Sequence, residues 1–354
     1  MSRAIRSGYA AFDRQPERDR LLAFETAAAQ LGTVAAIAEK DYWVCRVIDF
    51  LFKGRGDRLQ PTMTFKGGTS LSKGYNLIRR FSEDVDVVLS VPGLYNRATP
   101  NPFRKHVSKT RFPSVMAGVV QRAEAYVHGN LHDEVEAHFG PLGCVIEKPA
   151  SDAANVALII KYPLIAGDED AISSGVLLQC CVRADTEPHS PVPITPYVRR
   201  HLRGQWDLTT PAVRTLRPSR TFVEKLFAMH ATAAKFEKDR GNITDKNRLS
   251  RHYYDVAMME DTIYAKRALE GSLLDKVRNN QEFRWEQRGW VLKTAKRGSL
   301  KIVPPDGLMR PLSRDYDGMR NMMFDNPAPP SFDEVISKLR RLEADVNYTL
   351  FDEI

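Results

Sequence analysis

Two glycines, Gly67 and Gly68, separate a β-rich run from a helical run, and this junction constrains the fold more than any other feature of the chain. Residues 62–65, before the glycines, predict a short strand, and residues 69–80, after them, predict a helix. A second β-rich run at 82–91 follows and predicts another strand. A strand–helix–strand unit of this kind requires a fold in which a sheet and helices share one core.

The rest of the chain predicts an α+β protein of two domains, since 354 residues exceed the usual size of one domain. Helical patterns occupy 16–32 and 33–52, a helix is predicted over 115–139, and three runs rich in β-branched residues predict strands at 142–148, 155–163 and 175–185. After Tyr197 the patterns are helical, at 219–236, 248–261 and 331–351. We therefore predict an α/β domain over 1–200 and a mostly helical domain over 201–354.

The Gly-Gly junction has the features of a phosphate-binding turn. Without β-carbons at Gly67 and Gly68, the backbone amides of Gly68, Thr69 and Ser70 can point at a bound anion. The hydroxyls of Thr69 and Ser70 add donors, and Lys73 lies one helical turn further on. A Gly-Gly turn alone is more often a simple connection between a strand and a helix, with no role in binding. No GxxxxGK[ST] sequence is present, so the turn is not a Walker P-loop.

Asp84 and Asp86 strengthen this interpretation. Residues i and i+2 of a strand face the same side, so the two carboxylates converge while Val85 and Val87 face the other side. Paired carboxylates are typical ligands of Mg²⁺ or Mn²⁺, which they share with substrate phosphates. An isolated Asp-x-Asp is more often the solvated face of an amphipathic strand. Next to the Gly-Gly turn, it predicts that one element holds a nucleoside triphosphate and the next element holds its metal.

Charge and hydropathy indicate the partners. Lys and Arg exceed Asp and Glu by 52 to 44, a net charge of +8, which favours an anionic partner. The basic stretches at 103–111 and 293–301 are candidates for contacts with an RNA backbone, although charged loops are usually just solvated. The N-terminus has no signal-peptide pattern, and no run of about 18 apolar residues occurs, so we expect no membrane association and a cytoplasmic protein.

These motifs resemble those of a known family. The block "KGGTSLSKGYNLIRRFSEDVDVVL" strongly resembles the nucleotidyltransferase motif of the AbiEii-like toxins of type IV toxin–antitoxin and abortive-infection systems, a family that includes the mycobacterial MenT proteins. Weaker matches are "AEKDYWVCRVIDFLF", "RTFVEKLFAMH", "RHYYDV" and "SFDEVISKLRRLEADVN". The resemblance implies a polymerase β-like nucleotidyltransferase fold whose helical domain completes the active-site cleft. It also implies four catalytic residues, Asp84, Asp86, Lys225 and Asp255.

The sequence around Lys225 and Asp255 gives each a local setting. Thr221 and Glu224 have the spacing of a capping box, which predicts that Lys225 lies in the first turn of its helix. Without the resemblance, Lys225 is equally well explained as a solvated surface lysine. Asp255 lies four residues after Arg251, so an ordinary helical ion pair between them is the simple interpretation. In the family context, Asp255 would instead orient Lys225 or the nucleotide.

One departure from the family pattern concerns the metal site. Polymerase β-like enzymes usually place a third carboxylate on a neighbouring strand, but the corresponding run here, "VLLQCCVRAD", offers Gln179 on the strand and Asp185 only near its end. Either Asp185 completes the site or two carboxylates suffice. The sequence leaves this choice open.

The resemblance predicts transfer of a nucleoside monophosphate (NMP) from an NTP to the 3′ end of tRNA, which would block translation in a toxin–antitoxin or phage-defence system. A cognate antitoxin, encoded nearby, is implied by the family alone. Two alternatives remain open at this point. The protein could bind an NTP without transferring it and act as a sensor or interaction component, or it could transfer the NMP to a protein side chain.

Overall fold

The computed structural model describes the chain at residues 6–54, 61–96, 98, 107–108, 110–149, 155–167, 175–201, 206–239, 248–284, 289–324 and 328–348. The chain forms two compact units. Unit 1 contains the residues up to Tyr75 together with Ser82–Leu216, and unit 2 contains Asn76–Phe81 together with the residues from Arg217 onward. The short segment Asn76–Phe81 is therefore part of unit 2, although unit 1 contains the residues on both sides of it.

Unit 1 is built on a seven-stranded mixed sheet with the strand order β4-β5-β6-β3-β2-β9-β7. The strands are β2 (Met63–Lys66), β3 (Val85–Leu89), β4 (Val145–Glu147), β5 (Asn155–Lys161), β6 (Gly175–Cys181), β7 (His189–Ile194) and β9 (Thr210–Leu216). β3 runs parallel to β6 and antiparallel to β2, and β2 runs parallel to β9. A separate two-stranded pair joins β1 (Arg6–Ser7) to β8 (Trp206–Asp207).

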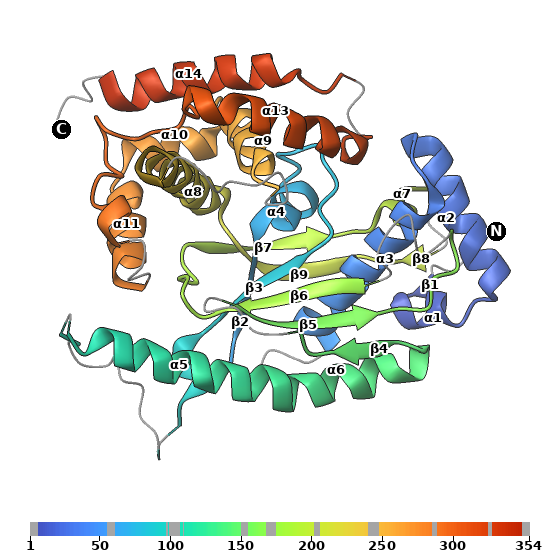
Figure 1. Cartoon of the computed structure of the whole chain (residues 1–354). Helices are drawn as coiled ribbons and strands as arrows, with labels where there is room; N and C mark the ends of the chain where they lie inside the picture. The colour runs from blue at the N-terminus through green and yellow to red at the C-terminus, as the bar shows by residue number, and fades with distance from the viewer. Residues whose placement is uncertain are drawn as a thin grey trace. The chain divides into compact units, whose positions relative to one another are not determined.

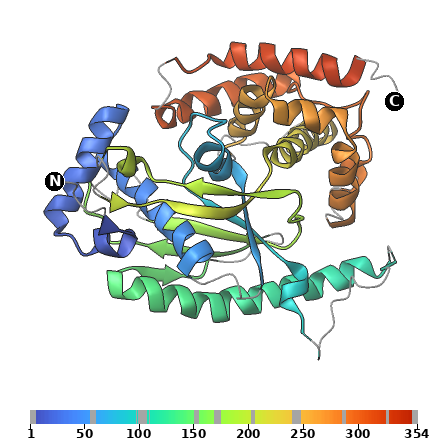
Figure 2. The same cartoon turned by 180° about the vertical axis from the view of Figure 1, so that it is seen from behind.

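Helices pack on this sheet. α3 (Ala35–Asp49) contacts β3, β6 and β9, and twelve of its residues are buried, as expected for a helix inside the core. α5 (Phe112–Tyr126), a π-helical turn (Val127–Leu131) and α6 (His132–Phe139) continue one another as a single long helix (Figure 1). The other helices of the unit are α1 (Tyr9–Asp13), α2 (Glu17–Leu31) and α7 (Tyr197–His201), and a π-helical turn at Phe50–Gly54 directly follows α3. Figure 2 shows α3 across the strands from the opposite side.

Apart from Asn76–Phe81, unit 2 is mostly helical in the residues described. It consists of α8 (Pro218–Asp239), α9 (Ser250–Met259), α10 (Ile263–Glu270), α11 (Leu273–Arg284), α12 (Gly289–Leu292), α13 (Asp306–Met319) and α14 (Phe332–Tyr348). α9 packs against α8, α13 and α14. The capping box predicted for α14 is present, because Glu334 N–H donates to Ser331 Oγ at 3.2 Å and Ser331 N–H donates to Glu334 Oε2 at 2.6 Å. The α+β fold class expected from the sequence is confirmed.

Two expectations about the elements need correction. The helix predicted over 69–80 begins at Gly67 and ends at Gly74, because Asn76 adopts a left-handed conformation (φ 52°) that no right-handed helix continues through. The region after Tyr197 is not entirely helical, since β9 lies within the central sheet between β2 and β7. The compact units divide after Leu216, and the expected domain boundary at residue 200 stays a prediction.

No single helix in the described part of the chain is long and apolar enough to span a membrane. The bent pair Glu17–Leu31 and Ala35–Gly54 meets the requirement on length and composition together, with an angle of 109° between its helices. α3, in the second half of this pair, is largely buried inside unit 1.

Candidate active site

The Gly-Gly turn lies directly beside the carboxylate motif. β2 ends at Lys66, which is the register partner of Asp86 on β3. The next residue, Gly67, has a φ of +81°, which residues with a side chain rarely adopt. A Cβ atom at Gly67 would lie 3.0 Å from Asp86 Cγ and nearer still to Oδ2. Glycine is therefore required here both by the backbone conformation and by the room that the Asp86 carboxylate occupies.

The two carboxylates flank Val85, the first residue of β3. Asp84 immediately precedes β3 and Asp86 is its second residue, and both are half-buried. Val85 and Val87 are fully buried in the core of unit 1. Carboxylate oxygens are the ligands that divalent Mg²⁺ or Mn²⁺ prefers. Because Gly67 has no Cβ, no side chain at that position covers the Asp86 carboxylate. The residues present therefore fit a divalent cation.

The hydroxyl groups of the turn brace the motif internally. Thr69 Oγ1 donates to the carbonyl oxygen of Asp84 at 2.6 Å and lies 2.9 Å from Ser82 Oγ. Ser70 Oγ donates to the carbonyl oxygen of Gly67 at 2.8 Å, and the Ser70 amide donates to the same carbonyl. Both hydroxyl residues are buried, whereas Gly67 and Gly68 are half-exposed. The accessible backbone of the turn is thus at the two glycines.

Lys73 points into the core of unit 1. Its ammonium forms an ion pair with Asp41 of α3 and lies 3.1 Å from the centre of the Tyr197 ring. The Lys73 and Asp41 side chains are 3% and 0% exposed. Burial alone would lower the pKa of Lys73, but Asp41 and its other neighbours outweigh burial and raise it. Lys73 is therefore charged, and the counter-charge that the structure gives it is Asp41.

A second ion pair connects α3 with the loop before the carboxylates. Lys40 Nζ lies 2.7 Å from Glu83 Oε2, one residue before Asp84. Adjacent residues of α3, Lys40 and Asp41, thus hold the two halves of the motif, the loop before Asp84 and the helical turn that carries Lys73. This gives a structural reason for the "AEKDYW" stretch, whose function sequence reasoning did not identify.

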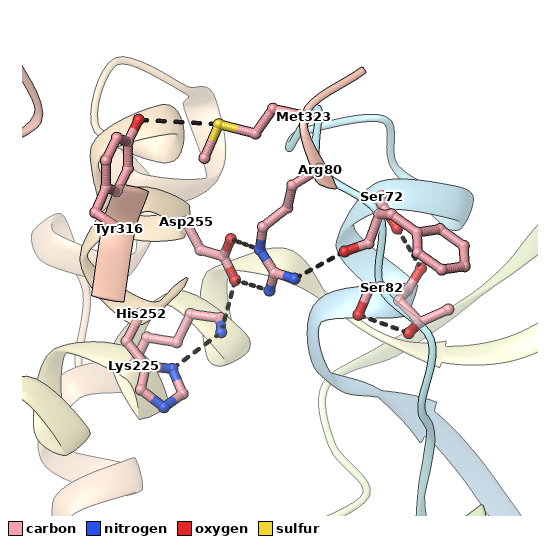
Figure 3. Close-up of polar contacts among 10 residues, drawn as sticks. Ser72, Arg80, Ser82, Lys225, His252, Asp255, Tyr316 and Met323 are labelled. Carbon is pink, nitrogen blue, oxygen red and sulfur yellow. Dashed lines mark hydrogen bonds and ion pairs between the residues drawn. The ribbon is translucent and has the colours of Figure 1, made fainter. Parts of the chain in front are cut away.

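Lys225 and Asp255 meet within unit 2. Lys225 Nζ lies 2.9 Å from Asp255 Oδ2 and 3.3 Å from His252 Nδ1 (Figure 3). α8 begins at Pro218, so Lys225 lies in its third turn, and the predicted capping box of Thr221 with Glu224 is wrong. Glu224 instead pairs with Arg220 at 3.0 Å.

Asp255 has a partner that sequence reasoning missed. Arg80 contacts both carboxylate oxygens, with Nε 2.7 Å from Oδ1 and Nη2 2.8 Å from Oδ2. The expected ion pair was with Arg251, one helical turn away. Burial alone would raise the pKa of Asp255, but Arg80 and Lys225 outweigh burial and hold it well below its usual value. No local pattern points to Arg80, because it lies 175 residues away in sequence.

Burial has the opposite effect on the bases around Asp255. Burial lowers the pKa of Lys225, with contributions from Arg80 and Arg251, while Asp255 opposes the shift. Burial and Lys225 hold the pKa of His252 well below its usual value. His252 is therefore neutral near pH 7, and its Nδ1 can accept a hydrogen bond from the Lys225 ammonium.

Gln179 occupies the strand position next to Asp86. β3 and β6 run parallel with Asp86 opposite Gln179, so their side chains share one face of the sheet. Asp185 lies beyond the end of β6, where its Oδ1 accepts from the Thr186 amide at 2.8 Å. Gln179 and Asp185 were the two residues considered at the position of a third carboxylate. The one beside Asp86 is the neutral Gln179.

Another set of metal-capable side chains lies on α6. His132, Asp133 and Glu136 have ligand atoms within 4.8 Å of one another. Asp133 and Glu136 are exposed, and exposed acidic groups are common without a metal. Asp84 and Asp86 do not belong to this set.

Comparison with known proteins identifies the family. Residues 50–338 match the family model described as "Nucleotidyl transferase AbiEii toxin, Type IV TA system". No curated protein matches the chain. Similar solved structures include MenT4, a nucleotidyltransferase toxin from Mycobacterium tuberculosis H37Rv (15% identity, 94% of this chain and 91% of that chain, TM-score 0.49), and JHP933 from Helicobacter pylori (12% identity, 87% and 93%, TM-score 0.36).

The family match covers most of the chain, including both carboxylates, the Gly-Gly turn, Lys225 and Asp255. It identifies the protein as a nucleotidyltransferase and implies an NTP substrate and an antitoxin partner. The chain belongs to the AbiEii nucleotidyltransferase toxin family of type IV toxin–antitoxin systems.

Proposed function

We propose that this toxin transfers an NMP from an NTP to a hydroxyl group at the 3′ end of tRNA and thereby blocks translation. The observation that carries the proposal is the close approach of Gly67 to Asp86, which places half-exposed backbone beside a half-exposed carboxylate. In the reaction, the acceptor hydroxyl loses its proton to solvent as its oxygen forms a bond to the α-phosphorus, the bond from that phosphorus to the bridging oxygen breaks, and pyrophosphate leaves.

Asp84 and Asp86 are the residues that would hold Mg²⁺ or Mn²⁺. When bound, the divalent cation supplies charge stabilisation for the phosphates and the departing pyrophosphate. The backbone of Gly67 and Gly68 approaches the phosphates, and the Thr69 amide is the next donor along the turn. Lys66, the register partner of Asp86, adds positive charge at the end of β2.

The other predicted site residues receive narrower roles in this proposal. The Thr69 and Ser70 hydroxyls brace the turn and the loop before Asp84, and Lys73 fixes the turn to α3. Lys225 has the role that the family resemblance gives it, which is to neutralise charge that develops on the phosphates. Asp255, whose two oxygens are both engaged, acts through Lys225 and is a positioning residue.

A tRNA acceptor is supported by charge. The chain carries a net charge of +8, and Lys293 and Lys296 are exposed near the end of α12. Lys301 of the same stretch pairs with Glu237, while the other stretch, 103–111, lies mostly outside the described residues. Because translation takes place in the cytoplasm, the proposal places the toxin there. Its antitoxin would oppose its activity. The toxin would serve a toxin–antitoxin or phage-defence function.

The test uses the purified protein with Mg²⁺, total tRNA and each α-labelled NTP in turn. Asp84→Asn is the matched control, because it removes one charge with almost no change in size. Label on tRNA with the wild type but not with Asp84→Asn is the expected result, and the NTP that gives label identifies the base. A thermal unfolding curve for each protein shows that the variant is folded.

Two results would contradict parts of the proposal. Label on protein would move the acceptor to a side chain and leave the transfer chemistry intact. No label on any acceptor, with NTP binding still measurable, would contradict transfer under these conditions. Repeating the reaction with Mn²⁺ tests whether the choice of cation is the cause.

A further inference from the structure

Asp84 comes one residue before the strand pairing of β3 begins. Pairing of β3 with β6 begins at Val85, and its pairing with β2 begins at Asp86. The two neighbouring strands therefore fix the backbone of Asp86 from both sides, whereas Asp84 precedes both ladders. In the proposed function these two carboxylates hold the divalent cation together. Contacts other than the strand ladders must therefore set the position of Asp84.

Two side-chain contacts hold the chain at this point. From the Gly-Gly turn, Thr69 Oγ1 donates to the carbonyl oxygen of Asp84 at 2.6 Å. From α3, Lys40 Nζ lies 2.7 Å from Oε2 of Glu83, the residue just before Asp84. The Lys40 and Glu83 side chains are 4% and 19% exposed. A largely buried ion pair thus lies directly before the first carboxylate of the motif.

The part of α3 that carries Lys40 is itself firmly held. The Glu39 carboxylate accepts a hydrogen bond from the Ala166 amide at 2.8 Å. Asp41, on the other side of Lys40, accepts from the Tyr197 amide at 2.5 Å. Glu39, Lys40 and Asp41 are all buried. The Lys40 ammonium therefore extends from a fixed helix, and this allows it to fix the residue that it contacts.

The ion pair also sets the direction in which the chain enters β3. Val85 and Val87 are buried in the core of unit 1, to which α3 contributes and where α3 contacts β3. The ion pair turns Glu83 toward the same helix. Adjacent side chains of an extended chain point to opposite sides. With Glu83 held at α3, the Asp84 side chain is directed to the other side of the strand, the side of Asp86.

We propose that Lys40 is a positioning residue for the divalent cation, because it holds Glu83 against α3 and so sets the Asp84 carboxylate on the same side of β3 as Asp86. This inference rests on the proposed function, in which Asp84 and Asp86 bind the cation. Lys40 acts through Glu83 and the backbone, and all four residues belong to unit 1. Loss of a residue that orients metal ligands from behind commonly lowers metal affinity about 10–100-fold.

The first test measures Mn²⁺ binding by electron paramagnetic resonance without nucleotide. Lys40→Met should weaken Mn²⁺ binding by about tenfold or more. The sign of the change is decisive, because removal of a positive charge would by itself strengthen the binding of a cation. Lys161→Met is the control, since it breaks the ion pair of Lys161 with Glu147 in the same unit, and it should leave Mn²⁺ affinity unchanged. Urea denaturation shows that each variant is folded.

A double variant tests whether Lys40 acts through Glu83. If it does, Lys40→Met/Glu83→Met should lose about as much Mn²⁺ affinity as Lys40→Met alone, because both changes break one contact. If only charge mattered, the double variant would bind Mn²⁺ as the wild type does, since the two lost charges are opposite. A role in stability alone predicts a lower free energy of unfolding with unchanged Mn²⁺ affinity.

The second test is a crystal structure of Lys40→Met without a cation, in which the Asp84 carboxylate should have left the side of β3 that carries Asp86. An unmoved Asp84, or Mn²⁺ affinity at least as high as that of the wild type, overturns the role of Lys40. If Lys40→Met does not fold, the double variant decides, because it removes both members of the pair. If the wild type binds no Mn²⁺, the proposed function loses its cation, while the crystal structure still tests whether Lys40 orients Asp84.

Discussion

Gly67 and Asp86 approach each other so closely that a side chain at position 67 would displace the Asp86 carboxylate. A Cβ atom there would lie 3.0 Å from Asp86 Cγ, and the φ of +81° already disfavours any side chain. The glycine required by the turn and the carboxylate required by the chemistry are thus one packed unit. This explains why the two motifs lie so close in the sequence.

We predict that Gly67→Ala reduces transfer activity by about two orders of magnitude or more, on the scale of a misplaced reacting group. The methyl group must displace the Asp86 carboxylate. Gly32→Ala separates crowding from backbone strain, because Gly32 has a φ of +69° with nothing within 4 Å of its Cβ position. The control should lose about 1 kcal/mol of stability and keep full activity. Activity is compared at a temperature where the unfolding curves show that both variants are folded. Equal losses of activity in Gly67→Ala and Gly32→Ala would contradict this account.

The buried pair of Lys73 with Asp41 should be structural. Lys73→Met leaves Asp41 charged and buried, so the free energy of unfolding should fall by about 3–5 kcal/mol, measured by urea denaturation. Lys73→Met/Asp41→Asn should lose less than the single variant, and Lys53→Met, at an exposed lysine, should change little. If the folded double variant has lost NTP affinity, Lys73 contacts phosphate, as the sequence first suggested.

Gln179→Glu tests how many carboxylates the site uses. A third carboxylate beside Asp86 should raise the affinity for Mn²⁺ without nucleotide, on the order of tenfold, because ligand charge sets divalent affinity. Mn²⁺ binding by electron paramagnetic resonance measures this without any turnover. Gln179→Ala is the control and should give no gain. A Glu variant that binds Mn²⁺ no better than the wild type would show that position 179 does not face the metal.

His230 should make unit 2 sensitive to acid. Its Nδ1 accepts from the Lys301 amide at 3.0 Å and its Nε2 lies 3.2 Å from the Val291 carbonyl oxygen, a pattern only the neutral ring satisfies. Burial lowers the pKa of His230 below that of the unfolded chain. The contribution of His230 to the free energy of unfolding is therefore fully present above about pH 6.5. It falls as the pH drops toward the folded-state pKa of His230, because the unfolded chain then binds more protons.

Urea denaturation at pH 7.5 and 5.5 measures this loss, which is up to about 1.4 kcal/mol per pH unit for each such group. His252, whose pKa is also lowered, contributes with the same sign. His230→Gln should reduce the difference between the two pH values. An unchanged difference in His230→Gln would remove His230 as a cause.

The stretch around Lys293 and Lys296 should contact RNA if tRNA is the acceptor. Replacing both with alanine should flatten the dependence of log affinity on log salt by roughly 0.7–0.9 for each phosphate that is no longer neutralised. Lys266→Ala/Lys276→Ala removes the same charge from exposed positions of α10 and α11 and is the control. The same slope in both double variants would mean that the stretch is merely solvated.

Much of this fold follows from local pattern. The alternation of Asp84, Val85, Asp86 and Val87 placed the carboxylates opposite the core, and the apolar face of α14 is buried as its spacing predicts. The strand β9 was not predicted from the sequence. Its segment "TPAVRTL" has a proline at the second position and lies at the start of a mainly helical region. The helix after Gly67 was predicted too long, since its end depends on the left-handed Asn76.

The charge partners could not be predicted, because they depend on tertiary packing. Lys73 has the right spacing to reach a phosphate, but the structure pairs it with Asp41, 32 residues earlier in the chain. Asp255 has an Arg at helical spacing, but the distant Arg80 binds it with better geometry. Local spacing gives the residues that can meet, and the packing of α3 and α9 decides which of them do.

The most direct measurement of the central claim is the sequence of tRNA 3′ ends in cells that express the protein. Wild-type protein should add nucleotides to the 3′ ends of tRNA as translation stops, whereas Asp84→Asn/Asp86→Asn, expressed at the same level, should leave the ends unchanged. Translation that stops with unaltered tRNA ends, or arrest that is equally strong in the double variant, would contradict the claim that these two carboxylates transfer nucleotides to tRNA.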